Sequence, residues 1–165
     1  MRTITSLTLI VSLIFLFPGC GGDGGRPADM PPLFPVTITI TQEGVPLEGA
    51  TVTLHSSTPS TYGTATGTTD SSGTARMRTY GFNGAPAGEY VVTVDRVALE
   101  GAEEFVQNPG ENPQLRGGTL YRFVNENFTK RGTTTLNMTV ADNRRGTTET
   151  FDVGAAVRIA NPDRL

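Results

Sequence analysis

The most reactive side chains of this chain are each present only once. Its 165 residues include one cysteine, Cys20, one histidine, His55, and one lysine, Lys130. Nucleophilic catalysis needs a base close to the nucleophile, and His55 falls at the outward end of an expected strand. We therefore interpret His55 as a surface residue. A zinc site needs several His or Cys ligands, so we predict no zinc and no cofactor.

Carboxylates are the other candidates for chemistry. Glu100, Glu103 and Glu104 could form an acid/base cluster, but the simpler interpretation is that they keep a loop soluble. Asp70 lies in a turn and could contribute to a calcium site, although no EF-hand spacing surrounds it. Lys130 lies in a polar Thr-Lys-Arg-Gly segment, which argues against a lysine–asparagine cross-link in a core. We predict no catalytic residue and no metal ligand, and we identify no ligand-binding residue.

The surroundings of Cys20 suggest a different chemistry. A basic Arg2 precedes an apolar run over residues 7–17, which is shorter than the ~20 residues of a membrane-spanning helix and is typical of a secretory signal. The following Pro18-Gly19-Cys20 resembles a bacterial lipobox, although Phe17 and Pro18 replace the usual leucine and small residue. The resemblance implies removal of residues 1–19 and lipidation of Cys20. The alternative is an ordinary secretory signal that leaves a free thiol at Cys20.

Lipidation would make the membrane a partner of the chain through Cys20. The next residue is Gly21 rather than the aspartate that commonly marks retention in the inner membrane, so we expect an outer-membrane or surface location. The net charge of −3 gives no electrostatic basis for binding nucleic acid. The pair Arg144-Arg145 falls in an expected turn between strands, so we interpret it as solvated.

The composition of the chain favours strands over helices. The chain contains 26 Thr, 20 Gly and 11 Pro and no Trp, a balance unsuited to long helices. Residues 20–35 are rich in Gly and then in Pro, which predicts a flexible spacer that stiffens toward its end. The regular pattern begins after this spacer.

Strict alternation over residues 36–41 predicts a half-buried strand with Val36, Ile38 and Ile40 on its inner face. Gly, Asn and Asp clusters at 42–44, 70–73 and 142–146 predict turns between such strands. We predict one two-layer antiparallel β-sandwich over residues 36–154 and a tail over 155–165. The other inward-facing residues are predicted to be Ala50, Val52, Leu54, Ala75, Met77, Tyr90, Val92, Val94, Leu136, Met138, Val140, Phe151 and Val153.

Three segments in order, residues 45–54, 67–75 and 85–94, resemble the carboxypeptidase regulatory-like domain. They contain Val-Pro-Leu-Glu-Gly-Ala, Thr-Asp-Ser-Ser-Gly and Pro-Ala-Gly-Glu-Tyr. Residues 128–136 and 150–153 are similar to the small lipoprotein version common in planctomycetes. The resemblance implies a transthyretin-like (prealbumin-like) fold, a seven-stranded antiparallel sandwich. It also implies a non-catalytic role, because the zinc-binding peptidase domain is absent from the chain.

Each motif also predicts a local structural role. Gly73 suits a turn position with positive φ, and Asp70 is placed to cap that turn. We expect Gly88 to allow a close approach of the chain before Tyr90. The Tyr90 ring should point inward, with its hydroxyl near the rim of the core.

Residues 98–132 depart from the short version of this family. We predict a long loop excursion before the last two strands, because the segment shows no clear periodicity and contains Asn108-Pro109-Gly110 and Gly117-Gly118. Part of it should pack back on the sandwich, and it is the first place to look for a binding surface. Its large apolar residues are Phe105, Leu115, Leu120, Tyr121, Phe123 and Phe128.

Two functions are compatible with these observations. The leading hypothesis is a non-catalytic, lipid-anchored protein of the bacterial cell envelope, with an envelope protein or glycan as partner or with a structural role. The alternative is a hydrolase of small substrates on a transthyretin-like fold. That alternative requires a pocket that joins His55 to Arg76 or Arg78.

Overall fold

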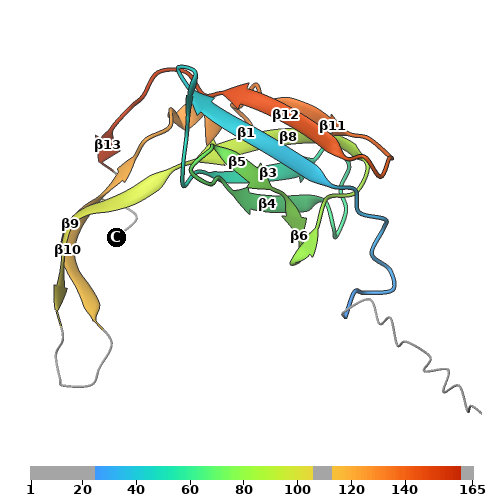
Figure 1. Cartoon of the computed structure of the whole chain (residues 1–165), viewed down its shortest axis with the longest axis horizontal. Coiled ribbons are helices and arrows are strands. Elements are labelled where there is room, and N and C mark those ends of the chain that lie inside the picture. Colours follow the sequence, from blue (N-terminus) through green and yellow to red (C-terminus); the bar gives the residue numbers. More distant parts are fainter. Residues whose placement is uncertain (1–24, 106–112, 161–165) are drawn as a thin grey trace, which may run out of the picture.

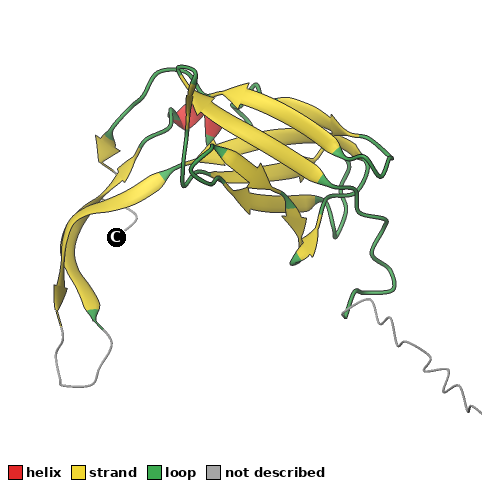
Figure 2. Cartoon of the chain, in the orientation of Figure 1, coloured by secondary structure: helices red, strands yellow, loops and turns green. Residues whose placement is uncertain are grey.

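The computed structural model describes residues 25–105 and 113–160, and within them the chain is almost entirely strands and turns. The predicted all-β class is confirmed (Figures 1 and 2). A one-turn 3-10 helix, η1 (Glu126–Phe128), is the only helical element among the described residues. The strands are β1 (Val36–Gln42), β2 (Val45–Pro46), β3 (Thr51–Ser56), β4 (Thr64–Thr68), β5 (Thr74–Arg76), β6 (Arg78–Thr79), β7 (Phe82–Asn83), β8 (Gly88–Asp95), β9 (Val97–Phe105), β10 (Gln114–Arg122), β11 (Asn137–Val140), β12 (Thr147–Asp152) and β13 (Ile159–Ala160).

The strands form three sheets. In the first, β1 lies between β12 on one side and β2 and β5 on the other. The second has the order β11-β8-β3-β4-β6-β7, and the third has the order β13-β10-β9. Among the described residues, no helix is long and apolar enough to cross a membrane.

The first two sheets share one hydrophobic core, and we call these two sheets the body. Alternation places apolar side chains of each strand on the inner face, since successive residues point to opposite sides of a sheet. Ile38, Val52 and Val94 are fully buried, as the period of two predicted. Leu136 and Phe151 are only partly buried, because they lie at the margin of the core. Val124 is fully buried as well, although no strand pattern surrounds it in the sequence.

One pairing corrects the expectation of purely antiparallel sheets. β1 and β12 pair in parallel, with Val36 opposite Thr147 and Thr41 opposite Asp152. Period-two patterns reveal which residues face inward but carry no information about strand direction. Strands so far apart in the chain are joined by a long connection and need not run antiparallel.

The predicted loop over residues 98–132 is also corrected. The structure places the strands β9 and β10 in this segment, paired along their length, followed by η1. Neither face of this ribbon is buried, so the sequence had no reason to alternate apolar and polar residues. The expected tail contributes too, because Ile159 and Ala160 pair with Arg122 and Tyr121 of β10.

The end of the predicted spacer packs against the body. Met30 is buried, and the amide of Phe34 donates to the carbonyl oxygen of Ala85 at 2.9 Å. Asp29 accepts a hydrogen bond of 2.8 Å from the hydroxyl of Tyr62. Residues 29–34 therefore belong to the folded part of the chain.

The local roles predicted for Gly73 and Tyr90 are confirmed, whereas the role predicted for Gly88 is not. Gly73 has a φ of 73°, and a Cβ there would lie 2.5 Å from the carbonyl oxygen of Ile40. The Tyr90 ring is buried, and its hydroxyl donates to the Pro86 carbonyl at 2.9 Å. The expected close approach at Gly88 is wrong, because nothing lies within 4 Å of the position of a Cβ. Glycine is favoured there by a φ of 147°.

Candidate functional site

The ribbon of β9 and β10, which we call the arm, projects from the body (Figure 1). Its two strands of nine residues each pair from Val97–Arg122 at the base to Phe105–Gln114 at the far end. None of its described side chains is buried, and Leu115 is 61% exposed. The arm therefore gains little stability from burial within this chain.

Glycines bend the arm partway along its length. Gly101, Gly117 and Gly118 have φ values of 71°, 73° and 87°, a region that residues with a Cβ adopt at a cost. A Cβ on Gly118 would also lie 3.0 Å from the carbonyl oxygen of Glu100. The Gly117-Gly118 pair, which suggested a loop in the sequence, thus permits a bend within a strand, and the ribbon of β9 and β10 is curved (Figure 1).

Phe123 and Arg96 fasten the base of the arm to the body. The Arg96 guanidinium lies 4.7 Å from the centre of the Phe123 ring and donates to the Glu48 carbonyl at 2.7 Å. The Phe123 carbonyl accepts a hydrogen bond from the Gln42 side chain at 2.9 Å. Val124 follows and is buried in the core. These contacts explain how the long excursion packs back on the body.

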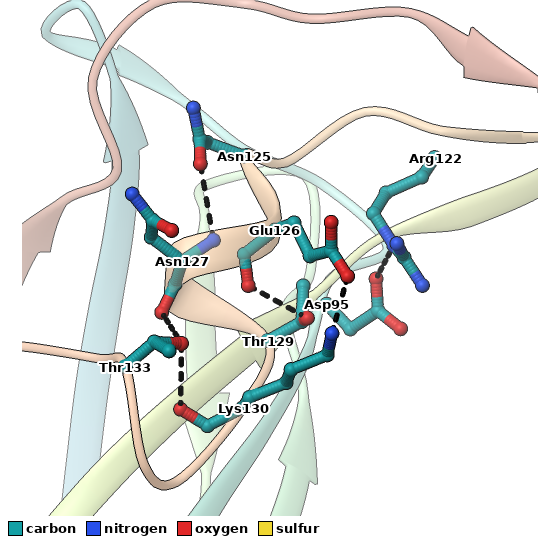
Figure 3. A network of polar contacts seen from close by, with 8 residues as sticks. All are labelled: Asp95, Arg122, Asn125, Glu126, Asn127, Thr129, Lys130 and Thr133. Carbon is teal, nitrogen blue, oxygen red and sulfur yellow. Dashed lines mark hydrogen bonds and ion pairs between the residues drawn. The ribbon is translucent and has the colours of Figure 1, made fainter.

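A polar network surrounds η1 just beyond this junction (Figure 3). The Asn125 side chain caps the turn by accepting from the Asn127 amide at 3.0 Å. Lys130 donates to Glu126, and this hydrogen bond lowers the pKa of the Glu126 carboxyl. Arg122 of β10 pairs with Asp95 of β8 at 3.3 Å. Lys130 is thus an exposed partner in an ion pair, as its polar surroundings predicted.

A second cluster lies where β13 joins the arm. The Arg158 guanidinium lies 3.7 Å from the centre of the Tyr121 ring and donates to a Glu100 carboxylate oxygen at 2.6 Å. An open hollow of about 420 Å³ lies beside these three side chains. Of the three glutamates considered as an acid/base cluster, only Glu100 takes part in these contacts. Glu103 and Glu104 lie further along β9 and are exposed.

His55 lies on β3 beside a small polar hollow of about 100 Å³. Its Nε2 lies 3.0 Å from the hydroxyl of Thr93, and Arg131 lines the same hollow. Burial, and secondarily the charge of Arg131, lower the pKa of His55. Arg76 lines a different hollow, of about 410 Å³, so these two hollows do not bring His55 and Arg76 together.

The other residues considered in the sequence either have a structural role, are exposed in turns, or lie outside the described part of the chain. One Asp70 oxygen accepts from the Ser72 hydroxyl at 2.6 Å and from the amides of Ser72 and Thr74 at 2.9 and 3.0 Å, which confirms its capping role. These hydrogen bonds, that of the Ser72 hydroxyl foremost, lower the pKa of Asp70. No group of three or more potential metal ligands occurs in residues 25–105 and 113–160. Arg144 and Arg145 are exposed in their turn. Cys20 lies outside the described residues.

Comparison of the chain with protein-family models, with curated proteins and with solved structures gave no match. The function is therefore argued from the geometry of the chain itself.

Sequence reasoning missed two features of this site. Arg158 lies in the expected tail, far from the arm in sequence, and no local pattern links it to Tyr121 and Glu100. The strand character of the arm was also missed. Its Val, Leu, Tyr and Phe residues favour strands, and that composition was the available signal.

Proposed function

We propose that this chain is a non-catalytic, lipid-anchored module of the bacterial cell envelope that binds a protein partner through its arm. The observation that carries the proposal is the arm itself: two nine-residue strands with no buried described side chain. The two residues of β13 pair only with the base of β10, so most of the arm is a two-stranded ribbon. Such a ribbon is marginally stable in water, and a third strand along its length would stabilise it.

The outer edge of β9 is where that third strand would add. Within the described residues β9 pairs only with β10, so the backbone groups along its other edge are free for strand addition. β9 contains three glutamates and neither lysine, arginine nor proline. Glu100 is paired with Arg158, so the exposed Glu103 and Glu104 are the charges that favour an extended partner segment with basic side chains.

The finer description of the fold belongs to this proposal. Without the arm, β13 and the two-residue strands β2, β6 and β7, seven strands remain in the body: β1, β3, β4, β5, β8, β11 and β12. This number supports the transthyretin-like sandwich of the carboxypeptidase regulatory-like resemblance. The parallel pair of β1 and β12 is then part of the sandwich.

The anchor and the absence of catalysis are supported by the sequence. The lipobox-like segment at Cys20 supports attachment to the outer membrane or the surface. The alternative of a small-substrate hydrolase required His55 and Arg76 or Arg78 in one pocket. His55 instead neighbours Thr93 and Arg131, which gives no support to that alternative.

Photo-crosslinking from the full-length protein in cells tests the arm contact. A photoreactive residue is placed at Glu104 on β9, and the matched control is placed at Thr139 on β11, another exposed position on an edge strand. We expect a discrete protein adduct from position 104 and not from 139. The double change Glu103→Lys and Glu104→Lys should abolish the adduct formed from a probe at Leu115. Equal adducts from 104 and 139, or none from 104, would overturn the proposal.

A further inference from the structure

A second surface, separate from the arm, presents an aromatic ring to solvent. Tyr80 lies at the tip of the β6–β7 hairpin and is 67% exposed. Tyr80 and Gly81 have φ values of 50° and 85°, so both central residues of the turn are left-handed. Turns of this kind favour Asn or Gly, and a tyrosine there is strained. Burial of the Tyr80 side chain does not compensate for this backbone strain, because most of the ring is exposed. This combination suggests that the exposed ring has a binding role.

The ring of a second tyrosine, Tyr62, packs against the ring of Tyr80. The rings of Tyr62 and Tyr80 lie edge to face, with centroids 5.5 Å apart and planes at 72°. Tyr62 is buried, and its hydroxyl donates to Asp29 at 2.8 Å. Because Tyr62 is buried and its hydroxyl is hydrogen-bonded, the Tyr80 ring packs against a fixed neighbour and is pre-organised for contact.

Two arginines share the outward face of the same stretch of chain. From residue 75 to residue 80, burial alternates: Ala75, Met77 and Thr79 are buried, whereas Arg76, Arg78 and Tyr80 are exposed. Alternate residues of an extended chain are about 6.5 Å apart, so Arg76 and Arg78 are neighbours on the outward side of this stretch. Tyr80 follows them in the turn after β6. Among the described residues, neither guanidinium forms an ion pair or donates a hydrogen bond, although Arg76 lies near enough to Asp70 to lower its pKa.

The neighbouring hollow adds further polar groups. Arg76 lines the hollow of about 410 Å³ together with Thr37 and Asn83, and Asn83 pairs with Arg78 across the hairpin. The surface therefore combines one aromatic face with hydroxyl, amide and guanidinium groups. The other exposed large hydrophobic residues among those described, Val45, Val97, Leu115 and Ile159, all lie on other strands.

This combination fits a carbohydrate better than a protein. The C–H face of a sugar ring packs on the electron-rich face of an aromatic ring, and its hydroxyls pair with amide and guanidinium donors. Protein hot spots centre on fully desolvated pockets, whereas Tyr80 is 67% exposed and is not among the residues that line the neighbouring hollow. That hollow has apolar lining from Val36 and Met77 as well as polar groups. The planar guanidinium groups match carboxylates in a bidentate manner. We propose that Tyr80, Arg78 and Arg76 bind a glycan that carries uronic acids.

Titration of the full-length protein in detergent with two matched oligosaccharides tests this proposal. The probes are tetragalacturonate and its methyl ester, which has the same ring without the charge, and binding is measured by calorimetry. We expect the acid to bind at least about tenfold more tightly than the ester. Arg78→Gln should remove most of that difference, whereas Arg144→Gln, a change at an exposed turn arginine on another element, should not.

Tyr80→Asn separates binding from folding. Asparagine favours the left-handed turn, so the melting temperature should rise by about 2 °C while acid binding falls at least about tenfold. The proposal is overturned if Tyr80→Asn binds tetragalacturonate as tightly as the original chain, or if the original chain binds neither probe. A protein captured in cells by a photoreactive residue at position 80, without glycan binding, would assign the ring to a protein contact. None of these outcomes depends on the arm.

Discussion

Thr69 shows how single polar groups hold this fold together. It is buried, and its hydroxyl donates to the Leu47 carbonyl at 2.6 Å and accepts from the Ala50 amide at 2.8 Å. It therefore satisfies two backbone groups at the start of β3, where no strand partner reaches them. Buried polar groups without partners are costly, so this hydroxyl should contribute measurably to stability.

The change Thr69→Val keeps the size of the side chain and removes both hydrogen bonds. We expect the free energy of unfolding to fall by about 2 kcal/mol, measured by urea denaturation. The matched control is Thr68→Val at the neighbouring exposed position, where the change should stay within about 0.5 kcal/mol. Equal effects at the two positions would contradict the role assigned to the hydroxyl.

Asp152 ties the end of β12 to the turn after β1. Its carboxylate accepts from the Gly44 amide, the Thr41 hydroxyl and the Gly154 amide, each at 2.8 Å. These hydrogen bonds, that of Gly44 foremost, lower the pKa of Asp152 from its ordinary 3.8. A carboxyl whose pKa is depressed by folding stabilises the protein above its unfolded pKa.

The contribution of Asp152 should therefore be complete above pH 3.8 and be lost as the pH falls through the lower folded value. Asp152→Asn should be less stable than the original chain at pH 6, and the difference should shrink below pH 3.8. Chemical denaturation across this range measures it. The control is Asp142→Asn at an exposed turn carboxylate, which should change the free energy of unfolding at pH 6 by no more than about 0.5 kcal/mol. A gap for Asp152→Asn that stays constant with pH would refute this assignment.

At the scale of elements, the arm differs from the strands of the body. The body strands are stabilised by burial of one face, whereas the arm relies on backbone pairing and on contacts at its base. Its bend depends on glycines whose φ values disfavour other residues. The arm should thus open locally without unfolding of the body.

Gly118→Ala and Gly117→Ala distinguish two sources of this bend. Both replace a glycine with positive φ, but only at Gly118 would the new Cβ lie close to neighbouring atoms. We expect amide hydrogen exchange in β9 and β10 to rise about fivefold for Gly117→Ala and further for Gly118→Ala. Exchange in β1, β3 and β8 should be unchanged. Greater exchange in those body strands would mean that the arm is part of the cooperative core.

At the scale of the molecule, the two ends of the body have different surroundings. The segment of residues 25–35 and the arm leave the body at opposite ends (Figure 1). The Tyr80 hairpin is linked to the first of these ends through Tyr62 and Asp29. A chain anchored at Cys20, as proposed, would hold the tyrosine surface near the membrane and extend the arm away from it.

Cys20→Ala tests the proposed anchor. We expect the variant to move from the membrane fraction to the soluble fraction and to lose metabolic labelling by a fatty-acid analogue. Its melting temperature should be unchanged, because the core is formed by residues 30–153, none of which is altered. Gly22→Ala, which leaves the cysteine in place, is the control and should stay in the membrane fraction. Labelling that persists without the thiol would contradict lipidation at Cys20.

The sequence by itself determined the all-β class and the inner faces of the main strands. Val36, Ile38 and Ile40 alternate with threonines because a half-buried strand needs an apolar residue at every second position. The turn at Asp70 and Gly73 was predictable for a similar reason, since its hydrogen bonds and its positive φ are local. Such features depend on near neighbours, which the sequence displays directly.

Only the tertiary structure decided the parallel pairing of β1 with β12, the arm, and the surroundings of His55 and Tyr80. Val36 meets Thr147, and Arg158 meets Tyr121, across separations that no local period encodes. The arm was hidden because a ribbon exposed on both faces has no need to alternate. His55 and Arg76 are both outward-facing in sequence, but β3 and β5 belong to different sheets, and the two side chains line different hollows. Burial of one face of a strand produces a local alternation of apolar and polar residues that can be recognised in the sequence. Long-range pairing and the placement of surface side chains depend instead on how the elements pack.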